Sequence, residues 1–440
     1  MDHLLSSESC IARHRKAASN FTRDRILTFR VLAALMLTIG TRSLQARMNS
    51  FIPKLGLPQV TVDKSAYSRA RHKLKHTAFI ELNQVAVVQT MYDDGDYATY
   101  TGFRILAIDG SRVRLPEYDA EVAKTFGTMA YANGQVSGKH AVALSSVCYD
   151  VLNRIALDAV LVPVKTHEVT AAIAHLHPTQ WNPDLLIQGL TFGPNDLFVE
   201  DRGYHSYRMM AAIAQTGAHF LIRCKQGSGM RIADAMLRGE GPDEQVTTIY
   251  LSAHLAKRQE YHGLPAELPV RFVRVILDNG TVEVLATSVL DDKQLTRDDL
   301  RAVYYLRWGI ETFYGICKTR LSLENFSGYS VEAIKQDFFA TVFLCGVETI
   351  LTADAEETLA GQRGGKPKKV NKATSFNTIK EQAFTLFYDK ARPNEQRLER
   401  LTQLFLTSPT VIRKDRNPPR KRHPDNKVLD WYRRYRKTAC

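Results

Sequence analysis

The segment FRILAIDG, residues 103–110, is the point at which this chain changes from a helical to a strand-rich pattern. A short apolar run that ends in Asp-Gly is typical of a buried strand that delivers a carboxylate at its end, here Asp109. A second run, DLFVEDRGY at residues 196–204, likewise delivers Asp201. Because strand runs alternate with helical patterns, the sequence predicts an α/β fold. Further strand runs lie at residues 140–150, 155–163 and 219–225.

The segment YYLRWGIETFYGICK, residues 304–318, predicts a helix with one polar and one apolar face. Thr296, followed three residues later by Asp299, predicts a capping box at the start of this helix. The apolar face would pack on a core, while the polar face would present a carboxylate flanked by two cations and a phenol. A merely solvated charged face is the alternative interpretation. At about 100° per residue, four polar side chains fall within roughly 60° of arc; they are Tyr304, Arg307, Glu311 and Lys318.

Three carboxylates can meet at one point if the two strand ends and the polar helix face converge: Asp109, Asp201 and Glu311. Such a cluster is too repulsive to stay ionised unless divalent cations neutralise it. Mg²⁺ or Mn²⁺ would match, because these hard ions prefer carboxylate and water ligands. Two such ions can activate a water or a 3′-hydroxyl and stabilise the leaving oxygen of a phosphodiester. Each aspartate taken singly could be a structural turn residue, so it is the joint placement with the helix face that favours a metal site.

The composition is that of a soluble globular protein with an anionic partner. The chain has 440 residues, 24% of them charged, and a formal net charge of +13. This charge predicts nucleic acid as the first candidate partner and an anionic membrane as the second. The longest apolar run near the N-terminus, residues 31–37, is far shorter than the ~20 residues of a bilayer span. In the tail at residues 411–437 cations alternate with aromatics, which favours nucleic-acid contact over a solvated tail.

The six cysteines are scattered along the chain without a Cys-x2-Cys pair. Their spacing argues against a zinc site and against a disulfide framework. It favours a protein of the reducing cytoplasm.

Five regions are predicted along the chain. Residues 1–98 are interpreted as a helical DNA-binding domain, because basic side chains recur in its segment SAYSRARHKLKH; a solvated basic face is the equal alternative for that segment. Residues 228–292 are interpreted as a β-rich insertion, because two strand runs flank the turn DNG. This insertion divides an α/β core into residues 99–227 and 293–360. A basic helical C-terminal region with its tail occupies residues 361–440.

The chain resembles the DDE transposases of bacterial insertion sequences, in the group with a Tyr-x2-Arg-x3-Glu-x6-Lys signature, insertion-sequence family four. Every spacing of the signature is intact in Tyr304, Arg307, Glu311 and Lys318. LAIDGSRVRLP, which contains Asp109, and VEDRGYHSY, which contains Asp201, match the first and second aspartate motifs of the family. SAYSRARHKL is similar to the helical segment upstream of the first aspartate. The resemblance covers about residues 60–350.

This resemblance implies an RNase H-like catalytic core interrupted by an all-β insertion. It implies cut-and-paste transposition by a homodimer, with cleavage at the terminal inverted repeats of the element and strand transfer into double-stranded target DNA. Two Mg²⁺ ions, with Mn²⁺ as a substitute, are the implied cofactors. The implied location is the bacterial cytoplasm at the nucleoid, with no membrane partner.

The resemblance also implies roles for single residues. Arg307 and Lys318 would grip the DNA backbone near the cleaved bond, and Tyr304 would bond a phosphate oxygen. Arg202, next to the second aspartate, is a further expected DNA contact. The metal ligands and catalytic residues would be Asp109, Asp201 and Glu311.

One departure from the family concerns a DNA hairpin step. Some relatives stack a flipped base on a tryptophan of the β insertion, whereas residues 228–292 contain no tryptophan. Tyr250 or Tyr261 could take that place. The three tryptophans of the chain are Trp181, Trp308 and Trp431.

Two other functions compete with an active transposase. The first is a domesticated or regulatory DNA-binding protein derived from a transposase, and the presence of all three acids argues against it. The second is an RNase H-like nuclease without strand transfer, which has less need of a tyrosine, an arginine and a lysine beside Glu311. A glycosidase with two carboxylates is disfavoured by the net charge of +13.

Overall fold

Two compact units make up the computed structural model. The helical unit comprises Met1–Thr90, Val113–Ala143 and Gly315–Cys440, and the sheet unit comprises Met91–Arg112 and Leu144–Tyr314. Trp181, Trp431 and the tail from residue 413 lie outside the described residues, so what the sequence predicts for them stays a prediction. The described residues are 2–23, 25–38, 43–56, 60–133, 136–177, 190–227, 229–362, 364–388 and 393–412.

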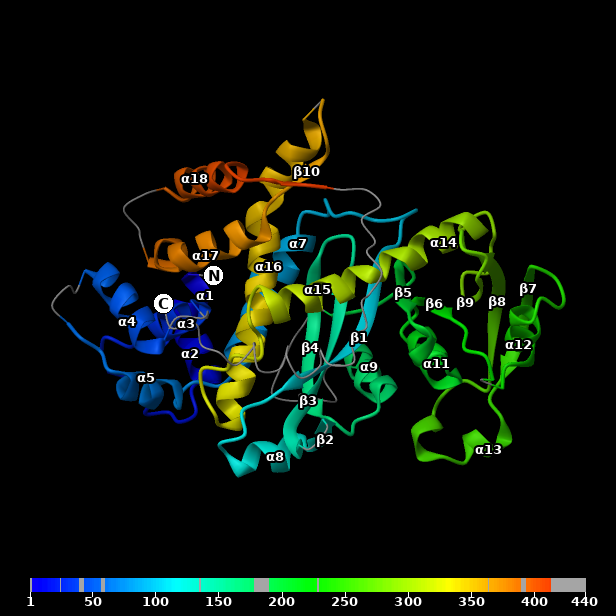
Figure 1. Ribbon diagram of the computed structural model, residues 1–440, viewed down its shortest axis with the longest axis horizontal. Helices are drawn as coiled ribbons and strands as arrows, with labels where there is room; N and C mark the ends of the chain where they lie inside the picture. The colour runs from blue at the N-terminus through cyan, green and yellow to red at the C-terminus, as the bar shows by residue number, and fades with distance from the viewer. Residues whose placement is uncertain are drawn as a thin grey trace. The chain divides into compact units, whose positions relative to one another are not determined.

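The paired strands of the sheet follow the order β2-β3-β1-β5-β6-β9-β8-β7, where β2 is Thr128–Asn133, and β4 also pairs with β3 (Figure 1). Strand β5 runs parallel to both β1 and β6. Across the sheet, the five core strands follow one another as β4, β3, β1, β5 and β6. Numbered by their order in the chain, this is 3-2-1-4-5, which is the arrangement of RNase H-like folds. The predicted α/β fold is confirmed. The core strands are β1 (Arg104–Arg114), β3 (Val136–Asp150), β4 (Ile155–Pro163), β5 (Asp196–Glu200) and β6 (His219–Arg223).

Burial explains why the central strands are continuous apolar runs. All five residues of β5 are buried, and so are Ile105–Ile108 of β1. A strand covered on both faces carries apolar side chains at successive positions instead of alternating ones. Helices α9 (Glu168–Leu176) and α11 (Tyr207–Gln215) of the same unit pack against each other, and α11 also packs against β6.

The β-rich segment at residues 228–292 extends this same sheet. Strand β9 pairs antiparallel with β6, β8 pairs with β9, and β7 pairs with β8. The predicted hairpin is confirmed, because β8 and β9 flank the DNG turn, in which Gly280 takes a φ of 78°. The boundaries of the five predicted regions stay predictions. The segment contains α12 (Arg231–Leu237), β7 (Glu244–Tyr250), α13 (Ala253–Ala256), β8 (Glu267–Ile276) and β9 (Val282–Thr287).

The capping box predicted ahead of the signature helix is confirmed at the start of α14 (Arg297–Leu306). The Asp299 backbone N donates to Thr296 Oγ1 at 3.2 Å, and the Thr296 backbone N donates to Asp299 Oδ2 at 3.0 Å. The Tyr100 hydroxyl donates to the other oxygen, Asp299 Oδ1, at 2.8 Å. The first turn of α14 is therefore tied to the segment that precedes β1.

The sequence predicts one regular helix for the signature. The structure has two helices there, joined at Arg307. Helix α14 ends at Leu306, and α15 comprises Trp308–Thr319. The Arg307 backbone N donates to Tyr304 O at 3.2 Å, and Ile310 N donates to Arg307 O at 3.2 Å. These are i to i+3 contacts of the 3₁₀ type, which tighten the turn and shift the side chains on either side of it.

Helix α16 (Val331–Gly361) forms the core of the helical unit. Helix α6 (Thr77–Asn83) and the helical turn after it pack on α16 so closely that a Cβ on Gly346 would lie 2.5 Å from Val87 Cγ1. By length and composition α16 could cross a membrane, but 72% of its apolar window is buried inside the protein, as in a core helix. Other helices against α16 are α3 (Phe29–Leu37), α17 (Lys372–Tyr388) and α18 (Asn394–Leu406) (Figure 1).

Candidate active site

Asp109 lies within β1, where the buried run of that strand gives way to half-exposed positions. The sequence predicts that the strand ends at Asp109, but β1 continues to Arg114. Gly110 N donates to Asp109 Oδ1 at 2.8 Å, and the Tyr314 hydroxyl donates to the Asp109 backbone O at 3.0 Å. Burial raises the pKa of the Asp109 carboxyl to about 6, with smaller contributions from the carboxylates of Glu311 and Glu168. This aspartate is therefore poorly solvated and close to other negative charge.

Asp201 directly follows β5, as predicted, and precedes the short helix η3 (Arg202–Tyr204). Arg223 Nη2 donates to Asp201 Oδ1 at 2.9 Å. The Tyr304 hydroxyl reaches the same oxygen at 3.4 Å. Because Arg223 ends β6, the charge of Asp201 is balanced by a cation from the neighbouring parallel strand.

Glu311 lies in the first turn of α15 and pairs with Arg307 one turn earlier. Arg307 Nη2 donates to Glu311 Oε1 at 3.2 Å. The same guanidinium interacts electrostatically with Asp201 and with Asp109. Only 8% of the Arg307 side chain is exposed, so these charges act through a poorly solvated environment. One guanidinium thus bonds Glu311 and interacts electrostatically with the other two predicted acids.

Tyr304 is almost buried between two cations. The guanidinium carbons of Arg307 and Arg223 lie 5.8 and 5.9 Å from the centroid of its ring. Burial raises the pKa of the Tyr304 phenol, so the hydroxyl remains a protonated donor at neutral pH. A buried phenol between two arginines and a carboxylate is suited to donate a hydrogen bond to an anion.

The two remaining predicted residues are placed differently. Lys318 lies in the last turn of α15, on the part of that helix that belongs to the helical unit. The Arg202 side chain is exposed on η3, and it is Arg223 that pairs with Asp201. Of the two tyrosines considered for base stacking, Tyr250 is 68% exposed and Tyr261 is partly exposed.

Sequence reasoning missed two residues of this site. Arg223 bonds Asp201 and also Glu283 of β9, with 2.6 Å between Arg223 Nη1 and Glu283 Oε1. A signal for it existed, because HFLIRCK is a strand run that ends in cations at the same sheet edge. Glu168, at the start of α9, lies so close to Gly110 that a Cβ there would be 3.4 Å from Glu168 Cγ. The spacing of the sequence carried no signal for this fourth carboxylate.

The donor set at this edge fits a hard divalent cation. Oxygen ligands from several carboxylates are those that Mg²⁺ prefers. Burial first, and the carboxylates of Glu311 and Glu168 after it, raise the pKa of Asp109, and a bound cation would favour its ionised form. In this structure the counter-charges are Arg223 on Asp201 and Arg307 on Glu311. Among the described residues, the one group of three side chains with ligand atoms within 4.8 Å of one another lies elsewhere, in the helical unit, so the three carboxylates stand further apart.

Comparison with known proteins identifies the family. The profile described as "Transposase DDE domain" matches residues 100–345, which is more than half of the chain. The chain therefore belongs to the transposases with a DDE domain, enzymes that generally use divalent metal ions.

A curated relative is the putative transposase y4zB of Sinorhizobium fredii (strain NBRC 101917 / NGR234), which is 23% identical over 146 residues. The match covers 33% of this chain and 39% of the relative, so the chain spans about two-fifths of that protein's length. Among solved structures, the cryo-EM structure of the piggyBac transposase synaptic complex with hairpin DNA matches 92% of this chain and 84% of its own. The TM-score of that match is 0.46 and the identity is 10%.

Proposed function

We propose that this chain is an active transposase of insertion-sequence family four. It would cut DNA at the ends of its element and transfer the freed 3′ ends into target DNA. The observation that carries the proposal is that the Arg307 guanidinium bonds Glu311 and interacts electrostatically with Asp109 and Asp201. These four residues lie inside the segment that matches the DDE family. A protein that only binds DNA has no need of a buried aspartate with a raised pKa beside two further acids and a cation.

Asp109, Asp201 and Glu311 would hold two Mg²⁺ ions, for which Mn²⁺ could substitute. When bound, such ions activate a water or a 3′-hydroxyl and neutralise charge on the phosphodiester. Arg307 and Arg223, which pair with Glu311 and Asp201 in this structure, would then turn to phosphate oxygens, where a guanidinium donates two parallel hydrogen bonds.

The remaining residues position the DNA end. The Tyr304 hydroxyl would donate a hydrogen bond to a phosphate oxygen. Lys318 would supply a point charge to the DNA backbone. Arg202, exposed on η3, contacts the backbone nearby. The Tyr314 hydroxyl donates to the backbone oxygens of Asp109 at 3.0 Å and Ser145 at 3.2 Å, so it holds β1 and β3 in register beside the acids.

A basic cavity in the helical unit supports DNA binding outside the acidic site. Its volume is about 1440 Å³. Positive side chains on such a surface bind the phosphate backbone by releasing condensed counterions. We assign this cavity to the terminal inverted repeat and the two protomers of a homodimer to the two ends. The basic residues of its lining include Arg23, Arg25, Arg69 and Lys73.

Cleavage of a labelled duplex made from the DNA that flanks the gene tests this function. With Mg²⁺, the wild-type protein should nick the duplex at the element end and join the 3′ end to a target plasmid. The variants Asp109→Asn, Asp201→Asn and Glu311→Gln should each lose cleavage while binding the duplex within a few-fold of wild type. Full cleavage by any one of them contradicts the assignment.

The same assay separates the alternatives. Specific binding without cleavage by the wild-type protein would indicate a regulatory descendant of a transposase. Cleavage without joined product, when a precleaved end is supplied, would indicate a nuclease.

A further inference from the structure

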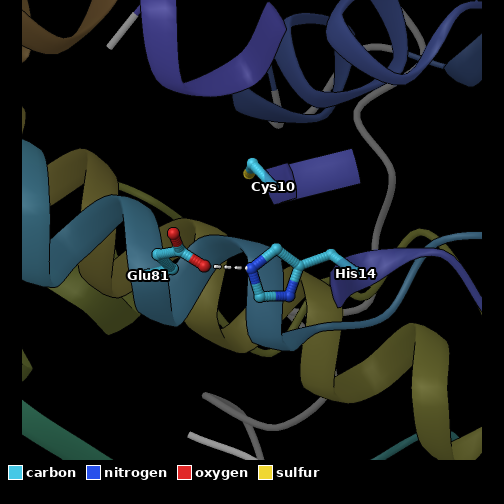
Figure 2. A group of neighbouring side chains, drawn as sticks. All are labelled: Cys10, His14 and Glu81. Atoms are coloured by element: carbon cyan, nitrogen blue, oxygen red, sulfur yellow. Dashed lines mark hydrogen bonds and ion pairs between the residues drawn. The ribbon is translucent and has the colours of Figure 1, made fainter. Parts of the chain in front are cut away.

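Cys10, His14 and Glu81 form a compact group in the helical unit (Figure 2). The first two belong to α2 (Glu8–His14), and Glu81 belongs to α6, which packs on α2. Cys10 and His14 are four positions apart, so both side chains leave the same face of their helix. Their ligand atoms lie within 4.8 Å of one another, and only 1% of Cys10 and 3% of His14 is exposed.

Hydrogen bonds fix the orientation of the imidazole. His14 Nδ1 lies 2.7 Å from Thr77 Oγ1, and His14 Nε2 is in contact with Glu81 Oε2. A contact between a ring nitrogen and a carboxylate needs a proton between the two atoms, and a metal ion can take the place of that proton. With Nδ1–H donating to the Thr77 hydroxyl, the Nε2 lone pair would point at the ion, as is usual for histidine ligands.

Arg13 fixes the orientation of the Glu81 carboxylate. It holds Glu81 Oε1 through Nη2, and its Nε lies 3.1 Å from Glu81 Oε2. An ion on Oε2 would displace the hydrogen bond from Arg13 Nε, while Arg13 Nη2 would still hold Oε1 and so fix the plane of the carboxylate. Support of this kind behind a ligand is characteristic of built metal sites.

We propose that Cys10, His14 and Glu81 bind a Zn²⁺ ion that joins α2 to α6. Thiolate, imidazole and carboxylate are the ligands that zinc takes in proteins, and a water would complete four-fold coordination. Binding would form one bond each to Sγ, Nε2 and Oε2. It would release to solvent the Cys10 thiol proton and the proton shared by His14 and Glu81.

Charge and burial favour this ion at this place. One thiolate and one carboxylate balance the two charges of Zn²⁺, so no net charge is left inside the group. The spacing of the cysteines did not reveal this site, because only one of its three ligands is a cysteine. The third ligand, Glu81, comes from another helix, 67 residues beyond His14.

Co²⁺ is the probe, because a thiolate bound to Co²⁺ gives a near-ultraviolet charge-transfer band that oxygen ligands do not give. The full-length wild-type protein should develop this band with one equivalent of Co²⁺ and lose it when Zn²⁺ is added. Cys10→Ser should abolish the band. Cys345→Ser, which removes a buried thiol of α16, should keep it. Thr77→Val should weaken Zn²⁺ binding about 10–100-fold in competition with a chromophoric chelator.

Two results would overturn the proposal: no band in the wild-type protein, or an undiminished band in Cys10→Ser. Far-UV circular dichroism shows whether Cys10→Ser folds. If it does not, X-ray absorption of the wild-type protein with one equivalent of Zn²⁺ decides the question. One sulfur at about 2.3 Å supports the site, and a shell of oxygen and nitrogen alone rejects it.

Discussion

Replacing Arg71 by methionine is expected to destabilise the helical unit while leaving the exposed side of α5 (Lys64–Arg71) in place. The basic segment around α5 reads as one DNA-docking surface, but the structure divides it. Arg69 is exposed and lines the basic cavity. Arg71 is 4% exposed and turned toward α16, where its Nη2 lies 2.7 Å from Asp337 Oδ1.

The expected loss follows from the groups that Arg71 satisfies. Its Nε donates to Gln336 Oε1 at 2.6 Å, and its Nη1 donates to Ser327 Oγ at 2.7 Å. Breaking a buried ion pair by removing one partner costs about 3–5 kcal/mol. Asp337 keeps a hydrogen bond from Ser327 N at 2.7 Å, which favours the lower end of that range. For a unit of this size, about 3 kcal/mol corresponds to a fall in Tm of about 6–12 °C.

Differential scanning calorimetry of the full chain measures this shift, with Arg69→Met as the matched control on the same helix. The control should move the transition by less than about 2 °C, since exposed substitutions change stability by under about 0.5 kcal/mol. The double variant Arg71→Met with Asp337→Leu should recover part of the loss, because it leaves no unpaired buried charge. Equal shifts in Arg71→Met and Arg69→Met would refute the reasoning.

Three further predictions concern single charged side chains. Arg69→Ala should lower the slope of log affinity for DNA against log salt by about 1, measured by fluorescence anisotropy, while Lys124→Ala on α8 (Ala120–Phe126) should not. The pKa of Asp109, about 6, lies above the ~4 of an unfolded aspartate, so this group's contribution to stability falls as pH rises from about 4 to 6. In EDTA, Asp109→Asn should therefore raise the unfolding free energy at pH 7 by up to about 3 kcal/mol and have little effect at pH 4; equal effects would contradict the linkage. Arg223→Gln leaves Asp201 and Glu283 without their shared cation and should lower the free energy of urea unfolding by about 1–2 kcal/mol, and no change would show that the pair contributes nothing.

Local patterns carried the parts of the fold that depend on neighbours in sequence. The capping box of Thr296 and Asp299 needs only four consecutive residues, and the hairpin of β8 and β9 needs only a turn between two strand runs. The buried strand β5 is recognised from its apolar run alone. The tightened turn at Arg307 was missed, because helical periodicity does not distinguish an i to i+4 contact from an i to i+3 contact.

Strand runs, helix faces and signature spacing are local properties. The amino-acid sequence therefore shows which acids and cations this family member carries and on which elements they lie. Which of these side chains meet depends on the tertiary structure. Arg223 pairs with Asp201 across 22 residues, and Arg71 pairs with Asp337 across 266. Such partners are chosen by strand order and by helix packing, which follow from burial of apolar surface over the whole chain and leave no periodic trace around either residue. For the same reason a basic helix can turn one arginine, Arg71, to the core and another, Arg69, to solvent.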